Sequence, residues 1–285
     1  MSSRLAVRFL MQGRWFVSSF PSKCVAQNQF KSSSRAVGIC VTLGPSKRNV
    51  YALSTPLAQR HFSTRNVSQN DIRPSDEEWK KYLVATDPET ESILAKDMLV
   101  FPDFLSEEEE KSILNEIEPY MRRLRYEYDH WDNAIHGYRE TEKLKWNKEN
   151  KKILQRVREL AFPAGIPQIA YVHVLDISKE GYIKPHVDAV RFCGNTIAGM
   201  CLLSSCVMRL ALEKDSSRYG DVLLKRRSLY VMNVENKAAP DIHKARYDYT
   251  HEVLPDDQSV FKGEKIPRDR RVSVICRNEP ENVKN

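Results

Sequence analysis

The sequence contains no run of about 18 consecutive apolar residues, so no segment is predicted to cross a bilayer as a helix. None of its six cysteines belongs to a Cys-x-x-Cys pair, which argues against structural zinc and against a disulfide framework. Acidic residues are absent from the first 70 positions, although ten lysines and arginines occur there. The overall composition is that of an ordinary folded protein, with 41% hydrophobic and 29% charged residues. A chain of 285 residues is long enough for one or two domains with a hydrophobic core.

The acid-free first quarter has the composition of an organelle targeting segment, which is rich in arginine and serine and poor in acids. Residues 4–16 (RLAVRFLMQGRWF) can form a helix in which arginines are interleaved with apolar side chains. RHFS at 60–63 resembles a matrix-peptidase cleavage site, so the mature chain would begin near Ser63. We therefore predict that residues 1–62 are a disordered mitochondrial presequence and that the protein is located in the matrix. A retained basic arm that binds nucleic acid is the alternative.

Beyond residue 70 the chain carries 35 basic and 38 acidic residues, so the remaining charge is slightly negative. Residues 63–98 are polar and mixed, with one short helical candidate at 75–84, and we predict a polar tether. Residues 99–280 are predicted to form one domain, and residues 281–285 a short tail. Two amphipathic helices begin this domain: 106–124, which starts with a capping box of Ser106 and Glu109, and 150–160, which starts at Asn150.

The hydrophobic period changes after Pro163. Short segments rich in β-branched and aromatic residues follow, separated by turns; they are 169–177, 195–203, 207–214, 221–232, 246–254 and 270–277. Two helices followed by six to eight short strands predict a mainly β fold with flanking helices. We expect a double-stranded β-helix, or jelly roll, with the N-terminal amphipathic helices packed on one sheet.

A histidine and a carboxylate lie two positions apart in GYIKPHVDAV, residues 181–190. Residues i and i+2 of a strand face the same side, so His186 and Asp188 would offer a nitrogen and an oxygen to one point. A mononuclear ferrous site needs two histidines and one carboxylate on one coordination face. The pair would supply two of these ligands, and a purely structural hydrogen bond is the alternative. HWD at 130–132 has the same spacing but lacks the alternating apolar flank.

A third ligand must come from a distant histidine. His251 lies in RYDYTHEVL, a predicted strand that could fold back beside the first pair, whereas His173 belongs to the preceding strand. His243, in a polar segment, remains the alternative third ligand. Further on, Arg271 and Arg277 are six positions apart in RVSVICR and therefore share a strand face. Two arginines that point inward need an anion, and a guanidinium group matches a carboxylate through two parallel hydrogen bonds.

The order His-x-Asp, His, Arg-x5-Arg resembles that of the AlkB family of Fe(II)- and 2-oxoglutarate-dependent dioxygenases over residues 99–278. The likeness is carried by RYEYDHWDNAIHGYRETEK, GYIKPHVD, FCGNTIAG, ARYDYTHEV and RRVSVICR. It implies that His186, Asp188 and His251 bind iron, with 2-oxoglutarate and O2 as co-substrates. In the implied 2-oxoglutarate pocket, Arg271 holds the distal carboxylate and Arg277 approaches the proximal end. The residues implied to bind this co-substrate are Tyr230, Arg271, Val272, Ser273 and Arg277.

This chain departs from the family pattern in three places. An asparagine and a tyrosine usually precede the His-x-Asp pair, and Leu175 and Ile177 stand there, so Tyr230 would take over their hydrogen bonds. In the final strand the family has an asparagine and a threonine, and this chain has Ser273 and Ile275 at those two positions. The segment 233–245 is longer than expected for close relatives. Residues 126–143, rich in aromatics and acids, would form either part of a substrate entrance or a structural loop.

The sequence favours one substrate class over another. Nucleic-acid demethylation needs phosphate contacts and an aromatic pocket for a flipped base, and the slightly acidic body shows no dense basic stripe. We therefore expect hydroxylation of a protein side chain by a monomeric enzyme. N-demethylation of methylated mitochondrial RNA and a non-catalytic interaction module are the alternatives. The resemblance also implies a role in mitochondrial lipid (fatty acid) metabolism and in programmed necrosis after alkylation damage.

Overall fold

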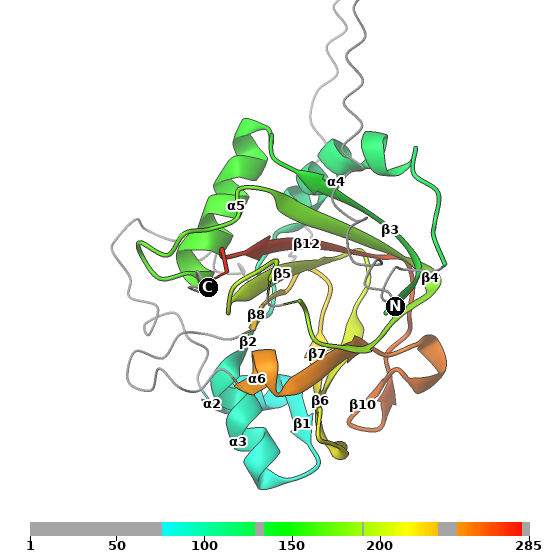
Figure 1. Cartoon of the computed structure of the whole chain (residues 1–285). Coiled ribbons are helices and arrows are strands. Elements are labelled where there is room, and N and C mark those ends of the chain that lie inside the picture. The colour runs from blue at the N-terminus through cyan, green and yellow to red at the C-terminus, as the bar shows by residue number, and fades with distance from the viewer. Residues whose placement is uncertain (1–75, 129–133, 190, 233–243, 281–285) are drawn as a thin grey trace, which may run out of the picture. The chain divides into compact units, whose positions relative to one another are not determined.

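The computed structural model describes residues 76–128, 134–189, 191–232 and 244–280 (Figure 1). The predicted presequence, the second His-x-Asp motif, the alternative ligand His243 and the predicted tail lie outside these residues. Within the described part of the chain, no helix is both long enough and apolar enough to span a bilayer.

Strands dominate the described chain, and short helices precede and flank them. The helices and 3-10 turns are α2 (Asp76–Trp79), η1 (Lys80–Tyr82), α3 (Pro88–Asp97), α4 (Glu107–Met121), α5 (Lys148–Ala161), α6 (Lys244–Tyr247) and η2 (Asp256–Gln258). The strands are β1 (Leu83–Ala85), β2 (Met98–Phe101), β3 (Ile135–Lys143), β4 (Val172–His186), β5 (Ile197–Leu202), β6 (Cys206–Leu212), β7 (Asp215–Leu224), β8 (Leu229–Met232), β9 (Tyr249–Val253), β10 (Val260–Phe261), β11 (Glu264–Lys265) and β12 (Arg271–Arg277).

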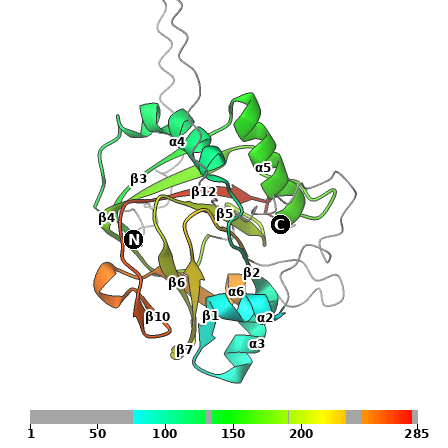
Figure 2. The same ribbon diagram turned by 180° about the vertical axis from the view of Figure 1, so that it is seen from behind.

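The long strand β4 joins two layers of sheet. Its first half pairs with β12 along residues 173–177, and its second half pairs with β9 at Ile183 and His186. From β4 the order runs through β12, β5, β8 and β2 on one side and through β9, β6, β7 and β1 on the other, all antiparallel. β3 also pairs with β4. Figures 1 and 2 show the two resulting layers from the front and from behind.

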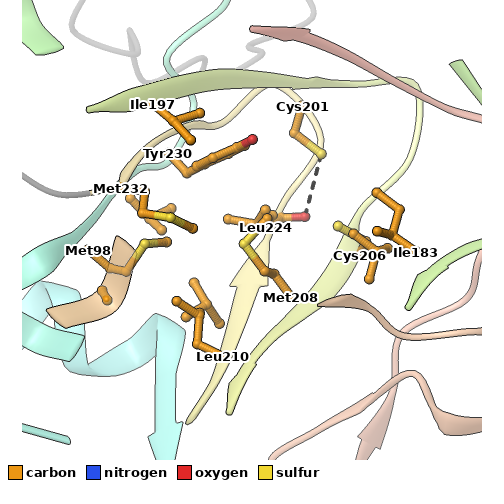
Figure 3. Close-up of a cluster of buried hydrophobic side chains, with 14 of the residues drawn as sticks. Met98, Ile183, Ile197, Cys201, Cys206, Met208, Leu210, Leu224, Tyr230 and Met232 are labelled. Atoms are coloured by element: carbon orange, nitrogen blue, oxygen red, sulfur yellow. Dashed lines mark hydrogen bonds between the residues drawn. The ribbon is translucent and has the colours of Figure 1, made fainter. Parts of the chain in front are cut away.

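A single buried cluster lies between the layers. Figure 3 shows Tyr230 and Met232 of one layer near Met208, Leu210 and Leu224 of the other, and all five belong to one hydrophobic core. Two antiparallel layers that share β4 and enclose one core are a double-stranded β-helix. The predicted jelly roll is confirmed.

Helices α4 and α5 cover the outer face of the β4–β12–β5–β8 layer. Ile113 of α4 and Val157 of α5 are buried in a second cluster with Val272 and Val274 of β12, so the predicted packing of amphipathic helices on one sheet is confirmed. The capping box at Ser106 is also present. The start of the second helix differs from the prediction.

Helix α5 begins earlier than its hydrophobic pattern indicates. Asn147, not Asn150, is the N-cap, and its side chain accepts a hydrogen bond from the Asn150 backbone N–H. The Asn150 side chain is buried and donates to the Ser112 carbonyl and to Glu116 of α4. Asn150 therefore links the two helices instead of capping one.

Residues 76–98 belong to the domain and do not form the polar tether that we predicted. β1 extends the β7 edge of the sheet, with Leu83 opposite Val222. Trp79 and Leu94 are buried in the cluster between the layers, and Leu94 is 0% exposed. The polar composition of this segment reflects its outer face, whereas a few large apolar side chains on the inner face anchor it.

Candidate metal centre

Two distant histidines become neighbours because β4 and β9 pair at this point. His186 and His251 are register partners across the two strands. Their ring centroids lie 4.2 Å apart at an angle of 49°. The predicted strand return that brings His251 to His186 is therefore present in the structure.

Asp188 completes a cluster of three ligand-type side chains. Its Oδ1 lies 3.6 Å from His186 Nε2, and its Oδ2 lies 4.0 Å from His251 Nε2. One candidate ligand atom from each residue can be chosen so that all lie within 4.8 Å of one another. Among the described residues, this is the only such group of three or more histidine, cysteine or acidic side chains. Two imidazoles and one carboxylate are the donor set that ferrous oxygenase sites use.

Backbone carbonyls orient this cluster. His186 Nδ1 lies 2.9 Å from the Lys184 carbonyl, which can accept a hydrogen bond from an N–H on that nitrogen, and Nε2 faces Asp188. The buried Arg246 of α6 donates from Nη1 to the Asp188 carbonyl at 2.9 Å and contacts the Cys193 sulfur at 3.3 Å. Arg246 was missed by sequence reasoning; its only signal is its place five residues before His251.

The surroundings favour the metal-binding protonation states. Burial opposes ionisation of Asp188, but the hydrogen bond from His186 and the positive charges around it outweigh burial and hold its pKa well below the ordinary range. Burial, together with the charge of His186, lowers the pKa of His251 to about 4. At neutral pH the site therefore contains an ionised carboxylate and a neutral His251 imidazole, both competent as ligands.

Alternate residues of β12 face the same cavity. Arg271, Ser273, Ile275 and Arg277 line it together with the three candidate ligands. Val272 does not, because side chains alternate along a strand and its own lies in the cluster beneath α4 and α5. A contact of Val272 with the co-substrate would have to come from its backbone, and it stays a prediction.

Arg271 is a buried cation that contacts a thiol. Its side chain is almost fully enclosed, and Nε donates to the Cys201 sulfur at 3.2 Å. Its Nη2 is buried and has no hydrogen-bond partner among the residues that the structure describes. Because an unpaired buried donor on a cation is costly, this atom fits a carboxylate that enters the cavity.

Arg277, at the other end of β12, has a different neighbour. Its Nη2 lies 2.5 Å from Nδ1 of His173, and His173 Nε2 lies 2.8 Å from Glu140 of β3. Its Nε is buried, and no group in the described part of the chain forms a hydrogen bond with it. The two guanidinium groups thus leave one unsatisfied donor at each end of the strand, which fits a dicarboxylate such as 2-oxoglutarate.

Tyr230 of β8 also lines the cavity, in the same layer of sheet as these arginines. Burial raises the pKa of its hydroxyl to about 12, so it is a neutral donor at physiological pH. Tyr230 and Gly199 face each other in adjacent strands, and a Cβ at Gly199 would lie 2.5 Å from Cε1 of the ring. Glycine at 199 is therefore required for the ring to lie where it does.

The two apolar replacements in β4 have different positions. Leu175 lines the cavity, whereas Ile177 is absent from its lining and is fully buried in the core. The remainder of the lining is mainly apolar, which keeps the cavity dry around the charged groups; these residues are Ile135, Ile183, Ile197, Met208, Met232 and Val253.

The chain also resembles known proteins, although no family model matches it. The mitochondrial alpha-ketoglutarate-dependent dioxygenase AlkB homologue 7 of Mus musculus is 49% identical over 190 residues, which is 67% of this chain and 82% of the relative. The Bos taurus protein of the same name is 49% identical over 185 residues, 65% of this chain and 80% of the relative. Among solved structures, a prolyl-4-hydroxylase from Pseudomonas putida is similar with a TM-score of 0.45 and 12% identity, over 67% of this chain and 97% of that one. The fit of the site and the identity to these relatives together show that this chain belongs to the AlkB homologue 7 family of alpha-ketoglutarate (2-oxoglutarate)-dependent dioxygenases, and that it is an oxidoreductase.

Proposed function

We propose that this dioxygenase hydroxylates a side chain of a protein substrate in the mitochondrial matrix, with His186, Asp188 and His251 as the iron ligands. The observation that carries the proposal is the convergence of these three side chains at a cavity that also contains two arginines with unsatisfied donors. When bound, iron with 2-oxoglutarate and O2 supplies an oxidant able to insert oxygen into a C–H bond.

The protein's own residues bind and orient the reactants. Arg271 is suited to the distal carboxylate of 2-oxoglutarate, with Ser273 beside it on the same strand face, and Arg277 to the proximal end. Tyr230 donates a hydrogen bond to the co-substrate and so replaces the polar side chains that positions 175 and 177 lack. The apolar lining excludes water and strengthens each of these charge-assisted contacts.

Composition supports a protein substrate. Residues 71–285 contain slightly more acidic than basic residues, and this negative charge disfavours binding of the phosphate backbone of RNA. The basic, acid-free residues 1–62 support delivery to the matrix. We also propose roles in mitochondrial lipid metabolism and in programmed necrosis, which rest on the resemblance to the family. A monomeric state is a further proposal.

The test supplies the full chain with ferrous iron, 2-oxoglutarate and O2 in a matrix extract. We expect succinate release together with a mass increase of one oxygen atom in a matrix protein. An Asp188→Ala variant should produce neither, whereas Glu142→Gln, a change at an exposed position of β3, should leave both intact. Absence of succinate release from the unaltered chain in the complete mixture would contradict the proposal.

N-demethylation of RNA is the second candidate, favoured by one surface feature. His136 of β3 stacks on Tyr182 of β4 at 5.2 Å and meets the edge of the exposed Tyr128. Ile135 and Ile183, the adjacent positions, line the cavity, so His136 and Tyr182 face the other side of the β3–β4 pair, where these rings could stack a base of a bound strand. Formaldehyde release from methylated mitochondrial RNA, with no protein mass shift, would select this candidate and reject the first.

A further inference from the structure

Three side chains from three adjacent strands form a hydrogen-bonded chain that ends in the cavity. Glu140 lies on β3, His173 on β4 and Arg277 on β12, and β4 pairs with both of the other strands. The two contacts are 2.8 Å from Glu140 Oε2 to His173 Nε2 and 2.5 Å from His173 Nδ1 to Arg277 Nη2. Both His173 and Arg277 line the cavity, whereas the Glu140 side chain is 38% exposed.

The chemistry of the three groups fixes the tautomer of the histidine. A guanidinium group can only donate, so Nδ1 of His173 must accept and cannot carry a proton. The ring proton therefore lies on Nε2 and is donated to the Glu140 carboxylate. The opposite tautomer would lose both hydrogen bonds, and a protonated ring would place a second cation against Arg277.

The contact also determines where Arg277 points. One edge of the guanidinium group is held by the His173 ring, and Nε remains buried without a hydrogen-bond partner. A long arginine side chain loses much rotamer freedom when it is fixed. A neighbour that fixes it before the co-substrate arrives lowers the cost of binding.

We propose that His173 is a positioning residue, which Glu140 holds in the Nε2–H tautomer so that it orients Arg277 toward the proximal end of 2-oxoglutarate. This inference rests on the proposed function of Arg277 and adds two residues that act through it. His173 does not bind the metal; its role is to prepare the guanidinium group. If the contact between His173 and Arg277 only stabilised the sheet, its loss would not change the affinity for 2-oxoglutarate.

The first test examines the full chain without iron or co-substrate. In nitrogen-15 NMR spectra at neutral pH, His173 should show an unprotonated Nδ1 and a protonated Nε2. Glu140→Leu should weaken this preference, whereas Glu140→Gln should keep it, because an amide oxygen also accepts from Nε2–H. A His173 ring with its proton on Nδ1 or on both nitrogens would overturn the proposal whatever the activity.

The second test measures 2-oxoglutarate affinity in oxygen-free solution with manganese(II) in place of iron. His173→Phe should bind about tenfold more weakly, as expected for the loss of one charge-assisted hydrogen bond. His173→Asn keeps an acceptor near the position of Nδ1 and should recover most of the affinity. The exposed Glu142, opposite His173 in the β3–β4 register, provides the control Glu142→Gln, which should bind as the unaltered chain does.

The outcomes separate this inference from the proposed function. If the unaltered chain fails to bind 2-oxoglutarate, the proposed function fails. If it binds and His173→Phe, folded as judged by its NMR spectrum, binds equally well, the positioning role alone is overturned. If His173→Phe does not fold, the Glu140→Leu variant provides the test. The proposal is overturned if this variant keeps both the His173 tautomer and the 2-oxoglutarate affinity of the unaltered chain.

Discussion

At the scale of single residues, two guanidinium groups of β12 bring positive charge to the cavity, and each has a hydrogen-bond contact with a side chain that is not a carboxylate. Arg271 contacts the Cys201 thiol, and Arg277 contacts the His173 ring. Arg270, by contrast, is paired with the buried Asp176 and with Glu118 of α4. The same short segment thus contains one arginine placed for stability and two placed to receive a ligand.

Replacement of Arg271 should separate binding from stability. We expect Arg271→Met to abolish 2-oxoglutarate binding while the free energy of unfolding of the ligand-free chain stays the same or rises, because a buried and incompletely paired charge is removed. Arg270→Met should instead cost about 2 kcal/mol, since it removes hydrogen bonds to a buried carboxylate. Urea unfolding of both variants checks this, and a large loss of stability in Arg271→Met would contradict the assignment.

The hydroxyl of Tyr230 should matter for binding more than for folding. Tyr230→Phe retains the packing against Gly199 and is expected to change the unfolding free energy by less than about 1 kcal/mol. We expect about tenfold weaker 2-oxoglutarate binding, from the loss of one hydrogen bond. Gly199→Ala should also weaken binding, because its Cβ displaces the ring. Isothermal titration of both variants measures these effects, and unchanged affinity in both would remove Tyr230 from the site.

At the scale of elements, β4 determines the site because it belongs to both layers. Its first half carries His173 beside β12, and its second half brings His186 to β9. Helix α6 adds Arg246, which holds the backbone of Asp188 just beyond the end of β4. The ligands therefore lie on regular elements or are tied directly to one, an arrangement that fixes their geometry before a metal binds.

Helix α3 and strand β1 should contribute to the stability of the whole domain. Leu94 is fully buried between the layers, so Leu94→Ala should lower the unfolding free energy by about 2–5 kcal/mol. Glu91→Ala, an exposed change on the same helix, should cost far less. Chemical denaturation measures both, and a negligible effect of Leu94→Ala would restore the tether that we first predicted.

The connection between α3 and β7 should depend on pH. Hydrogen bonds from Arg218 and then from Thr90 hold the pKa of Asp87 well below its ordinary value of 3.8. Because the folded pKa is the lower one, the stabilisation is complete above the ordinary value and is lost as the pH falls below it. Asp87→Asn keeps the N-cap and removes the charge. The stability difference between the two chains should be constant near neutrality and shrink below about pH 4; a difference that grows in acid would contradict this.

At the scale of the whole molecule, the jelly roll and the two histidines could be predicted because both follow from the pattern of strands and their pairing. Asp188 lies just beyond the end of β4, so its place beside His186 depends on the contact with Arg246 and not on the i, i+2 relation of a strand. That relation does apply within β12, where it turns the Val272 side chain away from the pocket. Residues 76–98 could not be predicted, since few apolar side chains anchor a mostly polar segment. The contacts of Arg246, Glu140 and Cys201 depend on which strands and loops become neighbours, and no local pattern records that.

The central claim is that two histidines on paired strands and Asp188, just beyond the end of one of them, hold one ferrous ion in this chain. Anaerobic titration of the full chain with ferrous iron, followed by metal analysis after desalting, tests it most directly. The unaltered chain should retain one iron per molecule, and His251→Ala should retain almost none because the two remaining ligands cannot complete the coordination face. Stoichiometric iron in His251→Ala would contradict the claim and place the third ligand elsewhere, with His243 the next residue to replace.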